Sequence, residues 1–181
     1  MPHVDEPLTT QHETTAFETL FHEHEAGLYR YLRSIAGSSI SADDLYQETW
    51  LRVSRHLAQH KSIRNFKSFL YTTATNLFRD ELRKLQVRRF FLGSLEDQSQ
   101  QGNESIWVAT DDENQNDLLG ALELGLKRLS PRQRMAFSLV YLEDMKIDEV
   151  AGIMKCAPGT VKSTLFKAVK KLRYELKEFR E

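Results

Sequence analysis

The chain has 181 residues, 40% of them hydrophobic and 28% charged, and its formal net charge at pH 7 is -1. This length allows one domain or two small ones with apolar cores, and the single cysteine, Cys156, excludes an internal disulfide framework and a cysteine-based zinc cluster. Because no apolar run approaches ~18 residues and the N-terminus lacks the basic-then-apolar pattern of a signal peptide, we expect a soluble cytoplasmic protein without membrane insertion.

The N-terminal segment predicts a frayed stretch followed by a long helix. Residues 1–12 carry no clear helical rhythm and are expected to be disordered. Thr15 and Glu18 form a capping-box pattern, after which apolar residues recur at helical spacing until Gly37. We therefore predict a first helix between Thr15 and Gly37.

Two further helical patterns complete a first domain. A second helix is expected to begin at Ser41 and to continue to Leu57. The periodicity lapses into a basic loop at residues 61–65 and resumes at Phe66. No strand alternation persists, so residues 13–92 predict a compact all-α bundle of three or four helices.

Charge is strongly segregated along the chain. Residues 61–92 carry eight basic and two acidic residues, residues 93–117 carry seven acidic and no basic residues, and residues 118–181 carry thirteen basic and eight acidic residues. The acidic stretch is rich in Ser, Gln, Asn and Gly, which predicts a flexible linker that leaves the separation of its flanking domains undefined. Local rather than total charge governs binding to nucleic acid, so a near-neutral chain can still bind it.

Residues 118–181 predict a second helical domain. Ser130, Pro131 and Gln133 supply an N-cap, a proline at the first helical position and a capping-box partner. The helix that they open is expected to reach Tyr141.

This domain then shows a helix-turn-helix pattern. Ile147, Val150, Ala151 and Met154 recur at i, i+3, i+4 and i+7, which gives a short helix one apolar face. A three-residue turn follows, and Pro158 suits the first turn of a second helix because its missing N–H costs nothing there.

The second helix of the motif has two distinct faces. Its buried stripe is predicted to hold Val161, Leu165, Ala168, Val169 and Leu172. The opposite arc carries Ser163, Lys167 and Lys170, with Phe166 and Lys162 on its shoulder. Cations, a hydroxyl and an outward Phe suit a DNA major groove. The alternative is an ordinary helical hairpin with a solvated Lys-rich face.

Two pairs of histidines and the single cysteine are the candidate metal or redox sites of the sequence. His22 and His24 lie two residues apart on a helix and therefore point to different faces, whereas His56 and His60 could share a metal ion but have no clear third ligand. Cys156 is interpreted as a small core residue of the turn, with a redox role left open. No nucleophile elbow, phosphate loop or supported carboxylate pair occurs, so we predict no metal, no cofactor and no enzymatic activity.

Four motifs occur in order along the chain. They are Asp43-Asp44-Leu45-Tyr46-Gln47-Glu48-Thr49, then Phe66-Lys67-Ser68-Phe69-Leu70-Tyr71-Thr72-Thr73-Ala74-Thr75-Asn76-Leu77 with Asp80 and Arg83, then Leu129-Ser130-Pro131-Arg132-Gln133-Arg134, then Gly159-Thr160-Val161-Lys162-Ser163. With these motifs the chain resembles, over residues 15–176, the bacterial RNA polymerase sigma factors of the extracytoplasmic-function (ECF) type. The resemblance implies an alternative sigma factor that directs promoter-specific initiation, built as two small all-α domains, regions 2 and 4, without region 3.

The resemblance also implies that the helix of the first motif docks on core RNA polymerase, at the clamp helices of its largest subunit. The residues so assigned are Asp44, Gln47, Glu48 and Arg52. Seen alone, this acidic cluster also fits a solvated first turn favoured by the helix dipole.

The following loop and helix would melt the -10 element and hold an unstacked base. The residues so assigned are Lys61, Arg64, Asn65, Phe66, Asn76, Arg79 and Arg83. Aromatic rings interleaved with cations suit single-stranded DNA, although Phe66 and Phe69 also fit a core. Phe69 stands where the family usually has Trp, and Thr75 stands where a basic residue commonly precedes Asn76, which puts one backbone contact in doubt.

The helix-turn-helix would read the -35 element of promoter DNA. The residues so assigned are Thr160, Lys162, Ser163, Phe166, Lys167, Lys170 and Lys171. The implied partners are core polymerase, through its clamp helices and flap, and promoter DNA, with an anti-sigma factor left open. The acidic linker would either thread toward the polymerase channels or serve as a plain tether.

Two other classes of protein fit parts of the sequence. A stand-alone helix-turn-helix regulator would bind duplex sites by itself, and an adaptor protein would bind no DNA. The aromatic and basic first domain favours the sigma factor, since neither alternative needs a surface that opens DNA strands.

Overall fold

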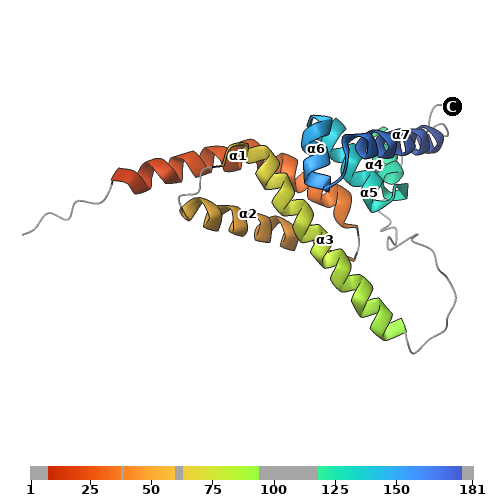
Figure 1. Cartoon of the computed structure of the whole chain (residues 1–181), viewed down its shortest axis with the longest axis horizontal. Helices are drawn as coiled ribbons and strands as arrows, with labels where there is room; N and C mark the ends of the chain where they lie inside the picture. The colour runs from red at the N-terminus through yellow and green to blue at the C-terminus, as the bar shows by residue number, and fades with distance from the viewer. Residues whose placement is uncertain (1–7, 38, 60–62, 94–117, 177–181) are drawn as a thin grey trace, which may run out of the picture.

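The computed structural model describes residues 8–37, 39–59, 63–93 and 118–176. The first three helices are α1 (Leu8–Ala36), α2 (Ala42–Ala58) and α3 (Phe66–Gly93). The second group is α4 (Leu118–Arg128), α5 (Pro131–Phe137), the π-helical segment η1 (Ser138–Leu142), α6 (Ile147–Met154) and α7 (Pro158–Glu175) (Figure 1). These ranges contain no strand, so the all-α prediction is confirmed. None of the described helices is long and apolar enough to cross a membrane.

The first domain is built on an apolar stripe of α1. Leu28, Tyr31, Leu32 and Ile35 recur at i, i+3, i+4 and i+7 and are fully buried against α2 and α3. The Tyr31 hydroxyl lies 2.7 Å from Thr75 Oγ1, and burial raises the pKa of Tyr31. Thr75 is therefore a core residue, which explains why this chain has no cation at that position.

The ends of α1 and α2 follow local signals with one exception. The Asp44 N–H donates to Ser41 Oγ at 3.1 Å, so Ser41 is the N-cap of the helix that was expected to begin there, and Gly37 ends α1 with a φ of 64°. The helix begins at Leu8, however, so residues 8–12, which we predicted to be disordered, are helical. No Gly or Pro lies between Leu8 and Thr15, and the capping-box pattern alone does not start a helix there.

In the second domain α5 starts as predicted but does not continue as an α-helix to Tyr141. The Gln133 N–H donates to Ser130 Oγ at 3.3 Å, and the Ser130 N–H donates to Gln133 Oε1 at 3.0 Å, which is the expected capping box. From Ser138 the chain forms the wider turn of η1, in which the Glu143 N–H donates to the Ser138 carbonyl oxygen at 3.0 Å.

The helix-turn-helix prediction is confirmed. Helices α6 and α7 are joined at Lys155, whose φ of 52° makes the left-handed turn, and Pro158 occupies the first turn of α7. Four residues of the predicted stripe are buried, and Val169 is half-buried. The buried four are Val161, Leu165, Ala168 and Leu172.

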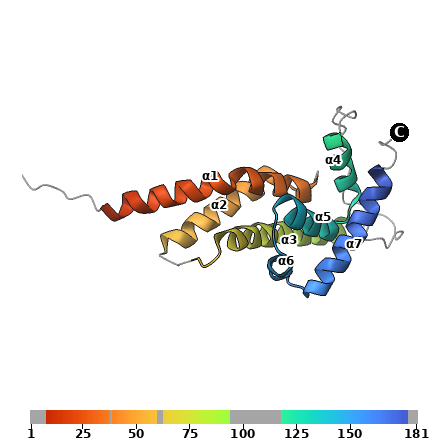
Figure 2. The same ribbon diagram turned by 90° about the horizontal axis from the view of Figure 1, so that it is seen from above.

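The two domains pack against each other in one structure. Helix α6 lies on α3, and α5 and η1 lie on α1 (Figures 1 and 2). One core cluster runs from Leu28 and Leu70 of the first domain to Met135 and Val150 of the second. The expectation that the linker leaves their separation undefined therefore does not describe this conformation, because both domains direct apolar surface to the same core.

A buried arginine connects the domains near this core. Arg134 of α5 is only 1% exposed and donates to three carbonyl oxygens, those of Ser34 at 3.1 Å, Lys127 at 3.2 Å and Leu129 at 3.0 Å. Burial lowers its pKa to about 10, so the guanidinium remains charged at neutral pH. Arg134 thus ties α5 to the end of α1 and to the end of α4.

We expect Arg134→Met to lower the free energy of unfolding by about 2 to 4 kcal/mol, because it leaves three carbonyl groups without their donor in a buried site. Urea denaturation followed by circular dichroism measures this change. The exposed neighbour Arg132 provides the control, since Arg132→Met should change stability by less than about 0.5 kcal/mol. Equal effects of both substitutions would show that the buried hydrogen bonds contribute nothing specific.

Candidate nucleic-acid interface

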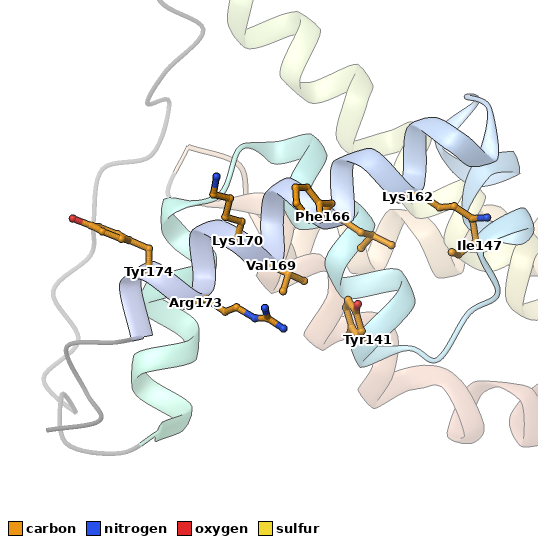
Figure 3. Close-up of a pocket in the computed structure, with 9 residues that line it drawn as sticks. Tyr141, Ile147, Lys162, Phe166, Val169, Lys170, Arg173 and Tyr174 are labelled. Atoms are coloured by element: carbon orange, nitrogen blue, oxygen red, sulfur yellow. The ribbon is translucent and has the colours of Figure 1, made fainter.

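An open groove of about 870 Å³ runs along α7 (Figure 3). Cations at Lys162, Lys170 and Arg173 line it together with apolar and aromatic side chains. The remaining lining residues are Tyr141, Ile147, Leu165, Phe166, Val169 and Tyr174. Phe166 is 72% exposed and Tyr174 is 73% exposed, so this face presents large aromatic surface to solvent. Aromatic rings beside cations can contact thymine methyl groups and phosphates.

The predicted -35 residues form two adjacent sets on α7, one that lines the groove and one beside it. Lys162, Phe166 and Lys170 line the groove, whereas Ser163, Lys167 and Lys171 are exposed but do not line it. At 100° per residue the second set lies next to the first around the helix. The Ser163 hydroxyl donates to the carbonyl oxygen of the half-buried Thr160 at 3.0 Å.

Three polar or aromatic residues of the groove, Tyr141, Arg173 and Tyr174, were not predicted from the sequence. Arg173 lies three residues after Lys170 on the same face, so helical periodicity could have identified it, and Tyr174 is its neighbour. Tyr141 belongs to η1, and no pattern within α7 indicates its presence in the groove.

Of the predicted -10 residues, those at the start of α3 are already engaged. Phe66 stacks on His24 at a ring distance of 5.4 Å and on Trp50 at 6.4 Å, and it is half-buried. Burial lowers the pKa of His24. Asn65 accepts from the Ser68 N–H at 2.9 Å and donates through Nδ2 to Glu149 Oε1 of α6 at 3.0 Å.

The remaining -10 residues differ in exposure. Arg79 donates to the carbonyl oxygens of Ile153 at 3.3 Å and Met154 at 2.9 Å, both at the C-terminal end of α6. Asn76 is half-buried, and Arg83 is exposed and pairs with Asp80 at 3.1 Å. Arg64 is exposed and Lys61 lies outside the described residues. The structure thus brings Asn65 and Arg79 together against the second domain.

The predicted polymerase-binding residues lie on the solvent side of α2. Asp44 and Gln47 are exposed, and Glu48 accepts from Arg52 Nε at 2.7 Å. This hydrogen bond lowers the pKa of Glu48. Glu48 and Arg52 also line a polar groove together with Arg83 of α3, so residues assigned to polymerase and to DNA lie close together there.

A buried carboxylate that the sequence did not indicate lies between the domains. Glu143 has a side-chain exposure of 5%, accepts from the Tyr71 hydroxyl, and pairs with Arg30 Nη2 at 3.3 Å. Lys67 Nζ donates to the Glu143 backbone carbonyl. The pKa of Tyr71 is raised by burial and by the hydrogen bond to Glu143. In the sequence Glu143 stands next to Asp144, and nothing in the pattern distinguishes the buried acid from its exposed neighbour.

The histidines form no site in the described part of the chain. His22 pairs with Glu25 at 3.3 Å in solvent, while His24 points inward, so the two histidines do face different ways. No group of three or more possible metal ligands occurs among the described residues, and His60 lies outside them. Cys156 is half-buried and packs against the core.

Comparisons with known proteins agree on both domains. The family model of sigma-70 region 2 matches residues 20–89, and that of sigma-70 region 4 matches residues 119–172. The chain is 34% identical to the ECF RNA polymerase sigma factor SigL of Mycobacterium tuberculosis over 169 residues, which cover 92% of each chain.

Solved structures show the same fold. The sigma factor RpoE of Bartonella quintana, determined in complex with the anti-sigma factor NepR, superposes with a TM-score of 0.70 at 25% identity and covers 90% of this chain and 97% of its own. CnrH, determined with the cytosolic domain of CnrY, superposes with a TM-score of 0.60 at 19% identity, covering 91% and 90%.

Proposed function

The chain belongs to the ECF family of RNA polymerase sigma factors, and from this we propose how its surfaces divide the work of promoter recognition. As a sigma factor it directs promoter-specific transcription initiation with core RNA polymerase. The observation that carries this function is the presence of both sigma-70 region 2 and sigma-70 region 4 in one chain, with a relative matched over 92% of its length.

We propose that core polymerase docks on the exposed side of α2. Asp44 and Gln47 lie off the buried stripe of Leu45, Trp50 and Val53, so they are available to a partner without disturbing the core. Glu48 and Arg52 continue this polar surface one turn further along the helix. Because the chain belongs to this family, we propose the clamp helices of the largest polymerase subunit as the partner of this surface.

We propose that the -10 element binds along α3 and the preceding loop. Asn76, Arg79 and Arg83 fall within about 60° of each other around α3, at 100° per residue. Phe66 is the first residue of the same helix, and Arg64 lies two residues before it. Cations beside aromatic rings on one surface suit an unstacked single strand.

We propose that the -35 element binds the exposed face of α7. Lys162, Phe166 and Lys170 line its groove, and Ser163 and Lys167 extend the same face. The groove is open to solvent, as a duplex ligand requires (Figure 3). A stand-alone regulator or an adaptor would not account for sigma-70 region 2, which matches residues 20–89.

We also propose that the protein acts in the cytoplasm and has no catalytic activity of its own. An anti-sigma factor is a further proposed partner, since RpoE of Bartonella quintana was determined in complex with one.

The test of the function is transcription of fragmented genomic DNA by core polymerase with and without the chain, followed by sequencing of transcript ends. We expect defined start sites that share -35 and -10 sequences and depend on the chain, while the free chain binds the same duplexes weakly. Tight sequence-specific binding by the free chain without any stimulation of core polymerase would instead support the stand-alone regulator.

The docking surface makes a second prediction. Asp44→Ala combined with Gln47→Ala should weaken binding to core polymerase about tenfold, by removing two polar contacts, while changing stability by less than about 1 kcal/mol. A titration with immobilised core polymerase measures the affinity. Asp148→Ala with Gln86→Ala removes an exposed acid and an exposed amide elsewhere and is the matched control. Unchanged affinity of the α2 variant would remove this surface from the docking site.

A third prediction concerns Lys167 and Lys171, two lysines on the exposed face of α7. Lys167→Ala should reduce the free energy of binding to the preferred -35 sequence by about 1 to 3 kcal/mol, because a base contact is lost. It should also relax the base preference at one position of the site. Lys171→Ala should weaken binding to all -35 sequences by the same factor, because a phosphate contact is lost. The slope of the logarithm of the binding constant against the logarithm of the salt concentration should then fall in magnitude by about one. Selection by holoenzyme from a randomised -35 library measures both. If each variant selects the parent consensus, this face does not read bases.

A further inference from the structure

We propose that the C-terminal end of α3 is a further DNA contact, which binds the duplex next to the -10 element on the side of the -35 element. The contact is made by Lys84, Val87, Phe90 and Phe91, here called the terminal patch, all of which are exposed. This inference rests on the proposed binding of the -10 element along α3. It adds Phe90 and Phe91, which lie beyond the end of the sigma-70 region 2 match at residue 89.

The terminal patch is apolar on a side of the helix where polar residues are expected. Val87, Phe90 and Phe91 are 55%, 77% and 72% exposed, and the two Phe rings meet edge to face with their centroids 5.9 Å apart. At 100° per residue these three side chains point within about 100° of one another, on the side opposite Phe78 and Leu85, which pack in the core. Large apolar side chains gathered on a solvent face mark an interaction site.

The charge around the terminal patch favours an anionic partner. Residues 82–93 contain four cations and no acid. Arg88 and Arg89 are exposed and form no ion pair with another described residue, and Lys84 pairs with Glu81 at 2.6 Å in solvent, where such a pair is weak. A second copy of the chain would bring like charges together on this surface, whereas a phosphate backbone would neutralise them.

The position of the terminal patch on α3 identifies the anionic partner as promoter DNA. Asn76 and Arg83, both proposed to bind the -10 element, point within about 40° of Val87 around the helix axis. Phe90 follows Arg83 by seven residues, which is about 10 Å along the helix and about three base pairs along a duplex. A duplex that contacts Arg83 and continues in this direction therefore passes over the patch.

The order of elements along the chain decides which side of the -10 element the terminal patch meets. The unstacked base is proposed to bind near Phe66 at the N-terminal end of α3, so DNA that is still paired lies toward the C-terminal end. The second domain, proposed to bind the -35 element, follows α3 in the chain. In Figure 1 the C-terminal end of α3 projects away from the other labelled helices, which leaves room for a duplex.

The cation and the aromatic rings of the terminal patch make different contacts. Lys84 binds a phosphate, and the rings of Phe90 and Phe91 pack against sugars and base edges in the minor groove, where inserted apolar side chains bend the duplex. The minor groove distinguishes the four base pairs poorly. The patch therefore adds affinity for duplex with little preference for its sequence.

Two pairs of variants separate the rings from the charge. Phe90→Ser with Phe91→Ser removes both rings, whereas Phe90→Tyr with Phe91→Tyr retains them. Lys84→Ala removes the cation of the patch, whereas Arg89→Ala removes a cation that points to the opposite side of the helix at 100° per residue. All four side chains are exposed, so each variant should fold like the parent, which circular dichroism checks.

The experiment measures binding of the holoenzyme to two DNAs that carry a single-stranded -10 element and no -35 element. One DNA ends at the edge of the -10 element, and the other continues toward the -35 side with about eight base pairs of duplex, which is enough to pass the terminal patch. We expect the parent to bind the longer DNA about tenfold more tightly than the shorter one, a gain within the reach of one aromatic contact.

The variants should differ in this preference for the longer DNA. The Tyr variant and Arg89→Ala should keep it, and the Ser variant should lose it. Lys84→Ala should lower the salt dependence of binding to the longer DNA by about one phosphate contact and leave the shorter DNA unaffected.

A preference for the longer DNA that persists in the Ser variant would overturn the inference. Weaker binding of that variant to core polymerase would overturn it as well, and so would loss of a self-association that sedimentation detects in the parent, because either result assigns the terminal patch to a protein. Failure of the proposed function would appear separately, as absence of initiation by the parent holoenzyme.

Discussion

The burial of charged groups between the two domains is the constraint on which the arrangement of the molecule depends. Glu143 and Arg134 are 6% and 1% exposed, and each must find its partners on the other domain or at its edge. An apolar interface could slide or rotate with little penalty, but an unpartnered buried charge costs several kcal/mol. Ser34, which accepts from Arg134 through its carbonyl and whose hydroxyl lies 2.8 Å from that of Ser138, further restricts the orientation. Shape and charge together therefore select one way for the domains to meet.

Much of the fold follows from local sequence. The caps at Ser41 and Ser130, the helical stop at Gly37 and the apolar repeats of α6 and α7 are short-range signals, and the structure contains each of them. The packing of one domain on the other could not be predicted in this way. A periodic stripe shows that a residue such as Val150 is buried, but not whether its neighbours come from its own domain or from α3, nearly eighty residues earlier.

The same difference between local signals and long-range packing applies to the candidate binding residues. The exposed faces of α2 and α7 were predictable because exposed polar residues and buried apolar ones alternate with helical period along each helix. The state of Asn65 and Arg79 was not, since their partners Glu149 and Met154 lie far away in sequence. A motif can assign a residue to DNA, whereas only the tertiary structure shows that the same donor is already bound. The assignment of Asn65 and Arg79 to DNA is a proposal from the motif, whereas their hydrogen bonds to α6 are those of this structure.

The π-helical turn at Ser138–Leu142 has a consequence for how this protein can tolerate insertions and deletions. Such a turn holds one residue more than the α-helix around it, and each residue advances a helix by about 100°. Removal of one residue within this turn would leave an ordinary α-helical turn and keep the residues on either side in nearly the same register, whereas removal of one residue from α5 would rotate Glu143 by about 100° away from Tyr71. The π-helical turn is therefore the place along α5 and η1 where a change of one residue in length disturbs the contact between Glu143 and Tyr71 least.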